Sequence, residues 1–340
     1  MATPEPTPHG EIRHHGLITL SLMLATIMQV LDTTIANVAL PSMRADLGAS
    51  SDTINWVLTS YIVAAAIVTP LSGWMSERFG RKEIFVVSIA GFVITSMLCG
   101  IAWSLETMVF FRMAQGVFGA AIVPLSQTFL LDINPKEKHG SAMAMWGAGI
   151  MVGPIIGPTL GGYLTETLNW RWVFFINLPL GAIALAGCMA YLPNMARRLR
   201  RFDFMGFAML ALGVGALQLM LDRGAEVDWF ASTEIWIEAG LALTGFWVFV
   251  IWIPGAEHPF LDPRMLLDRK VATGLVFIFV EGMVLLASLA VARPMLSTIF
   301  GYPVMTTGMV MAPRGVGTMI TMIIAGKLVR VVDARKMVVA

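Results

Sequence analysis

Long apolar runs, separated by short charged or Pro/Gly-rich stretches, dominate the pattern of the chain. Each run holds about 20 nearly uncharged residues, the length that an α-helix needs to cross a hydrocarbon layer about 30 Å thick. The runs lack the strict alternation of apolar and polar residues that is typical of barrel strands. We therefore expect ten membrane-spanning helices, at residues 17–40, 54–74, 83–103, 107–131, 141–163, 173–192, 204–221, 235–253, 272–292 and 304–326.

Composition points to the same fold class, an all-α integral membrane protein. Of 340 residues, 57% are hydrophobic and 13% are charged, against about 25% charged in soluble domains. The net charge of +1 provides no basic field for nucleic acid, so no nucleic-acid partner is predicted. Cys99 and Cys188 lie inside apolar runs, and no His or Cys cluster has metal-site spacing. We expect no metal, no cofactor and no enzyme active site.

Basic residues are distributed unevenly between the two sides of the predicted spans. The connections on the side of the N-terminus hold clusters such as 78–82 and 197–201. The connections on the other side hold four isolated arginines, Arg44, Arg171, Arg223 and Arg293. Because basic residues are retained in the cytoplasm, this asymmetry predicts a cytoplasmic N-terminus.

Two opposite charges lie where hydrocarbon should exclude them, Asp32 in the first span and Arg112 in the fourth. A carboxylate at such a depth must find a partner or take up a proton. We expect Asp32 to pair with Arg112, so that movement of either helix changes the proton affinity and the pair couples protons to transport. Two alternatives stay open: Asp32 makes only structural hydrogen bonds, and Arg112 forms a static salt bridge or extends to the interface.

Other polar residues inside the spans are candidates for a substrate cavity. We assign five of them to this set: Asn37, Gln115, Gln127, Glu281 and Arg314. Glu281 and Arg314 have opposite charges in consecutive spans, so a purely structural pair is the slightly favoured alternative for these two.

The fifth span contains glycines at every fourth position. Such spacing forms a smooth stripe on which another helix can pack closely, and the prolines kink the helix. We interpret this span as a gate helix that seals the outer side, and close packing without gating stays open as the alternative. Its candidate residues are Gly149, Gly153, Pro154, Gly157, Pro158, Gly161 and Gly162.

A short charged turn follows the second span and is a candidate cytoplasmic latch. An acid at position 77 can cap a neighbouring helix and pair with arginines across a gap, and an ordinary basic inner turn is the alternative. A related turn at 326–336 indicates two similar halves. The latch residues are Gly73, Glu77, Arg78, Gly80, Arg81 and Lys82.

These motifs, in this order, resemble the major facilitator superfamily, and within it the fourteen-helix drug/proton antiporters of the EmrB and QacA type. The stretch 73–82 resembles the superfamily loop signature, with Glu77 in place of the usual Asp. The stretches 31–41, 112–119 and 149–162 resemble the first-helix, proton and antiporter motifs of that branch. The stretches 170–179 and 221–230 are also similar to EmrB-type sequences.

The resemblance implies the major facilitator fold, with about ten of an expected fourteen helices present. It also implies a six-helix bundle (17–192), an extra two-helix hairpin (204–253) and an incomplete second bundle (254–340). Pro-rich polar composition predicts a disordered cytoplasmic tail (1–16), and the basic linker (193–203) either anchors to anionic lipid or is an ordinary inner loop. We expect a chain of this length to transport poorly or not at all, which a dye-efflux assay would test.

The function implied is multidrug efflux by proton/drug antiport and alternating access in the cell inner membrane. The proton gradient supplies the energy, and the partners are hydrophobic drug-like substrates, protons and membrane lipids. An EmrA-type periplasmic adaptor and a TolC-type outer-membrane channel are implied by the resemblance alone. Two alternatives stay open: a proton-coupled metabolite symporter of the same superfamily, and a non-functional truncated fragment.

Overall fold

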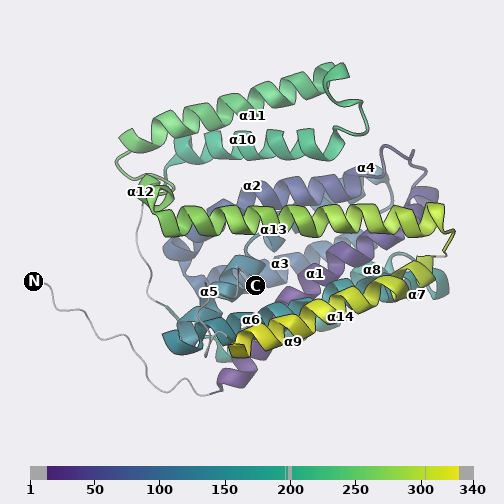
Figure 1. Ribbon diagram of the computed structural model, residues 1–340, viewed down its shortest axis with the longest axis horizontal. Helices are drawn as coiled ribbons and strands as arrows, with labels where there is room; N and C mark the ends of the chain where they lie inside the picture. The colour runs from purple at the N-terminus through teal and green to yellow at the C-terminus, as the bar shows by residue number, and fades with distance from the viewer. Residues whose placement is uncertain (1–13, 196, 198–200, 303, 329–340) are drawn as a thin grey trace, which may run out of the picture.

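The computed structural model describes residues 14–195, 197, 201–302 and 304–328, and every regular element in this part of the chain is helical (Figure 1). Eight stretches are long and apolar enough to cross a membrane, and they correspond to the first eight predicted spans. The first six spans comprise α1 (His15–Asp46), α2 (Trp56–Phe79), α3 (Arg81–Gly100), α4 (Leu105–Gly119), α5 (Ile122–Ile133), α6 (His139–Ile150), α7 (Val152–Thr167), α8 (Trp172–Phe175) and α9 (Asn177–Tyr191).

The rest of the chain adds two long helix pairs. The seventh and eighth spans form α10 (Phe204–Arg223) and α11 (Thr233–Trp252), and the predicted ninth and tenth form α13 (Arg269–Pro294) and α14 (Val304–Leu328). Short elements complete the order: η1 (Lys136–Lys138), η2 (Trp229–Ala231), η3 (Ile253–Gly255), α12 (Pro263–Leu267) and η4 (Met295–Ile299).

Some predicted segments fall on the edges of the described chain. The tail predicted at 1–16 lies outside the described residues up to residue 13, and α1 begins at His15. Part of the linker predicted at 193–203 lies outside them, at 196 and 198–200. The second charged turn, 326–336, is described only as far as Leu328, where α14 ends.

Three predicted spans are each divided into two helices, and a proline explains every break. Proline has no N–H to donate to the carbonyl four residues earlier, so that carbonyl loses its helical partner. The breaks follow the ends of α4, α6 and α8. In each case a proline comes shortly after the break: Pro124 after α4, Pro154 after α6 and Pro179 after α8. The Thr69 hydroxyl donates to one freed carbonyl, that of Ala120, at 3.4 Å. This hydroxyl also donates to the Ala65 carbonyl on its own helix at 2.7 Å, so it replaces the lost backbone bond of Ala120 only in part.

Helix α1 runs through the six-span bundle and contacts α5, α6, α7, α8 and α9. Two clusters of buried apolar side chains meet along it. One includes its residues up to Met28, and the other includes Leu31 and Ile35. Asp32 is therefore placed where the two apolar clusters join, with hydrocarbon-like packing on both sides.

The glycine stripe predicted in the fifth span packs directly on α1. A Cβ atom at Gly153 would lie 3.2 Å from the backbone nitrogen of Leu31, and one at Gly157 would lie 2.9 Å from Cβ of Thr34. The Thr34 hydroxyl also donates to the Gly153 carbonyl at 3.4 Å. Gly162, by contrast, faces open space. The stripe thus holds α7 against the helix that carries Asp32.

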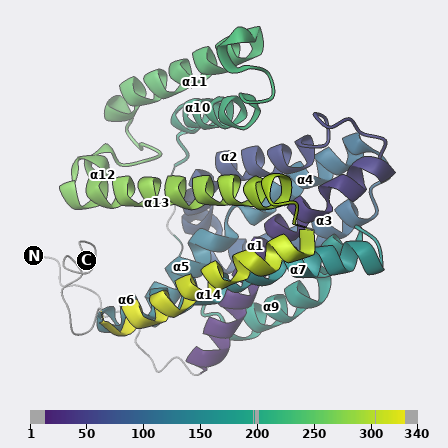
Figure 2. The same cartoon turned by 45° about the vertical axis from the view of Figure 1, so that its right-hand side comes forward.

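The last two helix pairs attach to different faces of the bundle. The α10–α11 hairpin packs on α2, on the side away from α9 (Figure 2). Its two helices come into backbone contact, because a Cβ at Gly245 would lie 2.6 Å from the nitrogen of Gly213. On another face, α14 packs against α6 and α7, with Gly315 beside Ile155. The two divided halves of the fifth span therefore connect α1 to α14.

We expect Gly153→Ala and Gly157→Ala to lower the thermal unfolding midpoint of the purified protein. Overpacking costs about 1–3 kcal/mol, which exceeds the gain of about 1 kcal/mol from replacing a helical glycine with alanine. Gly162→Ala is the matched control and should be neutral or stabilising. Equal midpoints for all three variants would show that the stripe does not set the distance between α7 and α1.

Candidate functional site

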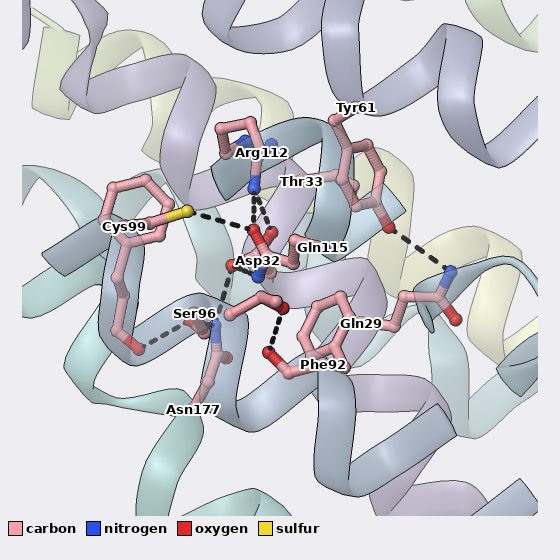
Figure 3. Close-up of polar contacts among 12 residues, drawn as sticks. Gln29, Asp32, Thr33, Tyr61, Phe92, Ser96, Cys99, Arg112, Gln115 and Asn177 are labelled. Atoms are coloured by element: carbon pink, nitrogen blue, oxygen red, sulfur yellow. Dashed lines mark hydrogen bonds and ion pairs between the residues drawn. The ribbon is translucent and has the colours of Figure 1, made fainter. Parts of the chain in front are cut away.

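A buried ion pair between α1 and α4 forms the centre of the site (Figure 3). Asp32 is 1% exposed and Arg112 is 0% exposed. Nη1 of Arg112 donates to Oδ2 of Asp32 at 2.7 Å. The two charges that the sequence places inside separate apolar runs are therefore in direct contact, as expected from the cost of burying either one alone.

The other carboxylate oxygen of Asp32 accepts hydrogen bonds from two neutral side-chain amides. Nε2 of Gln115, one turn after Arg112 on α4, donates to Oδ1 at 3.1 Å. Nδ2 of Asn177 donates to the same oxygen at 2.7 Å. Asn177 is the first residue of α9, directly after the break caused by Pro179. Three donors from two helices thus fix the carboxylate in one orientation.

The guanidinium of Arg112 is enclosed by polar and aromatic groups. Its Nη1 also donates to Oε1 of Gln115 at 2.6 Å, and its Nε donates to the Val57 carbonyl on α2 at 3.1 Å. The charge lies 4.5 Å from the ring centroid of Tyr61 and 5.6 Å from that of Phe174, within the range of cation–π attraction. Its Nη2 is buried and has no hydrogen-bond partner among the described residues. Arg112 therefore retains the two N–H groups of Nη2 for a further interaction.

A second layer of polar side chains surrounds the pair and extends to α3. Asn177 donates to the Ser96 hydroxyl at 2.9 Å, and Ser96 donates to the Phe174 carbonyl at 2.9 Å. On the side of α2, Nε2 of Gln29 donates to the Tyr61 hydroxyl at 3.4 Å. Sequence reasoning did not assign a role to these four neutral residues. Asn177 lies in the stretch 170–179 that resembles EmrB-type sequences, and that resemblance was the available signal.

Cys99 was interpreted as a small apolar filler, and the structure places it beside the site. It is fully buried, and its Sγ approaches Oε1 of Gln115 at 3.7 Å. In the part of the chain that the structure describes, no three His, Cys, Asp or Glu side chains form a group that could hold a metal ion.

Of the five candidate cavity residues, Gln115 joins the central cluster. Asn37 is exposed on α1, Gln127 is half-buried on α5, and both Glu281 and Arg314 are exposed on α13 and α14. Arg314 donates to the Ser288 hydroxyl. No ion pair joins Glu281 to Arg314 among the described residues, so the neutralising pair considered for them is absent there. Their order along the chain does not fix which way two long helices are rotated.

The candidate latch forms contacts inside the six-span bundle. Gly80 has φ +107°, a conformation that favours glycine, and it joins α2 to α3. Arg81 pairs with Asp132 at the end of α5. Nζ of Lys82 donates to the Met189 carbonyl at 2.9 Å and to the Leu192 carbonyl at 2.7 Å.

Acidic residues other than Glu77, the acid predicted for the latch, also bind the basic residues around the α2–α3 turn. Glu83, in the first turn of α3, pairs with Arg197 of the linker. Glu77 is half-buried, whereas Gly73 and Arg78 are exposed. The bonds of Arg81 and Lys82 connect α3 to α5 and α9 rather than to a second bundle. The expected contact across a gap between halves is thus not made by these two residues in this conformation.

Comparisons with known proteins agree with this architecture. The family model described as Major Facilitator Superfamily matches residues 22–340. The multidrug export protein EmrB of Escherichia coli (strain K12) is 38% identical over 324 residues, covering 95% of this chain and 63% of EmrB. The fatty acid resistance protein FarB of Neisseria gonorrhoeae is 38% identical over 325 residues, covering 95% of this chain and 64% of FarB.

Among solved structures, the proton:xylose symporter XylE bound to 6-bromo-6-deoxy-D-glucose has a TM-score of 0.63 at 15% identity, covering 92% of this chain and 68% of XylE. At this identity the likeness concerns the fold alone. The chain spans less than two thirds of the length of EmrB, at 63%.

We expect Arg112→Met to destabilise the protein by about 3–5 kcal/mol, because it leaves the buried Asp32 without its counter-charge. The double variant Asp32→Asn/Arg112→Met should lose less than the sum of the two single variants, since it removes both charges. Denaturant unfolding of the purified protein measures these differences, with the exposed Arg78→Met as control. Additive losses would contradict a coupled pair.

Proposed function

Because the chain belongs to the major facilitator superfamily, we propose that it exports hydrophobic drug-like compounds in exchange for protons, as a multi-pass membrane transporter. The observation that carries this proposal is the fully buried Asp32–Arg112 pair with its ring of neutral donors. The names of its relatives, a multidrug export protein and a fatty acid resistance protein, support export of apolar compounds. The activity, substrates and partners of a full-length transporter are part of this proposal.

Proton binding at Asp32 would change the balance of forces on Arg112. A proton on the carboxylate removes the negative charge that faces the guanidinium at 2.7 Å. Arg112 then retains the Val57 carbonyl, Gln115 and the Tyr61 ring as its contacts. In a low-dielectric interior this is a large electrostatic change, so it favours a different position of α4 relative to α1.

The packing of α1 provides a route from the proton site to the rest of the molecule. One side of α1 carries Asp32, and another side packs on the glycine stripe of α7 through Leu31 and Thr34. In turn, α7 packs on α14. A shift of α1 would therefore move α7 and alter the contact between the first bundle and α14, as alternating access requires.

We also propose that the protein lies in the cell inner membrane with its N-terminus in the cytoplasm. The distribution of Arg and Lys supports this orientation, since the basic residues of the α2–α3 turn and of the linker lie on the side of the N-terminus. An EmrA-type adaptor and a TolC-type channel would then connect the transporter to the outer membrane. The likeness to the symporter XylE does not favour sugar uptake, because it concerns the fold alone.

We expect Asp32→Asn to abolish the release of protons when a hydrophobic substrate is added to the purified protein. The reason is that an amide side chain, unlike a carboxyl group, neither binds nor releases a proton near neutral pH. A pH-indicator dye in weakly buffered solution measures the release, and substrate binding is measured in parallel by fluorescence. The matched control is Asp46→Asn on the same helix, where an exposed carboxylate accepts from Trp170 at 3.0 Å.

Two outcomes separate the parts of this proposal. Unchanged proton release in Asp32→Asn would contradict the assignment of Asp32 while leaving export possible. Absence of both binding and proton release in the unmodified protein would contradict drug export itself.

A further inference from the structure

The α10–α11 hairpin contains a buried carboxylate that the proposed exchange mechanism does not use. Glu238 lies in the second turn of α11 and is 9% exposed. Its Oε2 is buried and has no hydrogen-bond partner in the described part of the chain. Buried residues on the same helix include the apolar Ile235 and Ala242. An ionised carboxylate is strongly disfavoured in such surroundings unless it is paired or takes up a proton.

Arg223, a base of the neighbouring helix α10 that acts electrostatically on Glu238, is already engaged. Arg223, at the end of α10, forms an ion pair with Glu234. Glu234 and Glu238 are four residues apart and therefore lie on the same face of α11. Nε of Arg223 is also buried and without a partner among the described residues. The cluster thus contains one arginine, two carboxylates, and an unmatched donor and acceptor.

This cluster lies where the hairpin is attached to α2. The Arg223 guanidinium is 5.0 Å from the ring centroid of Trp56. Next to it, the Thr59 hydroxyl donates to Asp222, and Nδ2 of Asn55 donates to Glu226 at 2.5 Å. A change of charge beside Arg223 therefore acts at the junction between the hairpin and the six-span bundle.

We propose that Glu238 is a proton-binding site of the hairpin, and that its proton controls the attachment of the hairpin to α2. With the proton bound, Glu238 is neutral and Arg223 pairs with Glu234, as in this structure. When the proton leaves for water, the carboxylate of Glu238 competes for the same arginine, whose Nε is available. Arg223 is then drawn away from Trp56, and the junction loosens.

The charged groups around the site belong to three segments. Because α2 contributes only neutral side chains to the junction described above, the response to pH originates in the hairpin. The groups are Asp222 and Arg223 on α10, Glu226 and Asp228 on the connection, and Glu234 on α11.

Infrared spectroscopy of the purified protein near neutral pH tests the site directly, because a protonated carboxyl group has a C=O band separate from that of a carboxylate. We expect Glu238→Gln to lose a carboxylic-acid band that the unmodified protein shows. Glu257→Gln, the same substitution at an exposed acid just after the hairpin and outside the junction, should retain the band. Glu234→Gln should weaken it, because Arg223 becomes available to Glu238. Identical spectra for the unmodified protein and Glu238→Gln would overturn the proposal.

Hydrogen exchange tests the consequence at the junction. After correction for the intrinsic pH dependence of exchange, amides of residues 222–234 should exchange faster as pH rises in the unmodified protein and in Glu257→Gln. Glu238→Gln mimics the protonated form, so its corrected exchange should not change with pH. The same pH dependence in Glu238→Gln would show that another group controls the junction.

Discussion

The structure is organised around one electrostatic constraint, the burial of the Asp32 carboxylate and the Arg112 guanidinium in apolar surroundings. Burying either charge without the other would strongly destabilise the protein. An ion pair without neighbours would also leave the second carboxylate oxygen and the remaining guanidinium N–H groups without hydrogen bonds. Gln115, Asn177 and the Val57 carbonyl provide them. Helices α1, α2, α4 and α9 must therefore meet at one point, and the two apolar clusters along α1 close around it.

Backbone chemistry makes that meeting possible. Proline divides three of the spans, and the break before α9 brings Asn177 to the start of a helix beside Asp32. Glycine has the complementary effect on the other side of α1, where the absence of side chains at Gly153 and Gly157 lets α7 approach closely. Residues with little or no side-chain chemistry thus determine where the charged ones can act.

The sequence alone predicts the spans and the central pair, because both follow from the cost of polar groups in lipid. Eight spans correspond to membrane-length helices, and Asp32 and Arg112 have few other ways to be neutralised. Asn177, Ser96 and Tyr61 were not predicted, since a neutral polar residue in an apolar run has many acceptable partners. No ion pair joins Glu281 to Arg314 among the described residues, and the sequence gives no sign of this because helix rotation depends on packing. The roles of the latch, the gate helix and the cavity stay predictions.

Helix α1 both carries Asp32 and packs on the glycine stripe of α7, and these two roles together constrain how this protein can change during evolution. Substitutions that loosen the contact of Thr34 with Gly157 alter the helix that positions Asp32 two residues away. Under the proposed export function, selection on helix packing and selection on proton coupling would therefore act on one helix. Adaptation to new compounds should proceed more readily on helices that do not contact the ion pair.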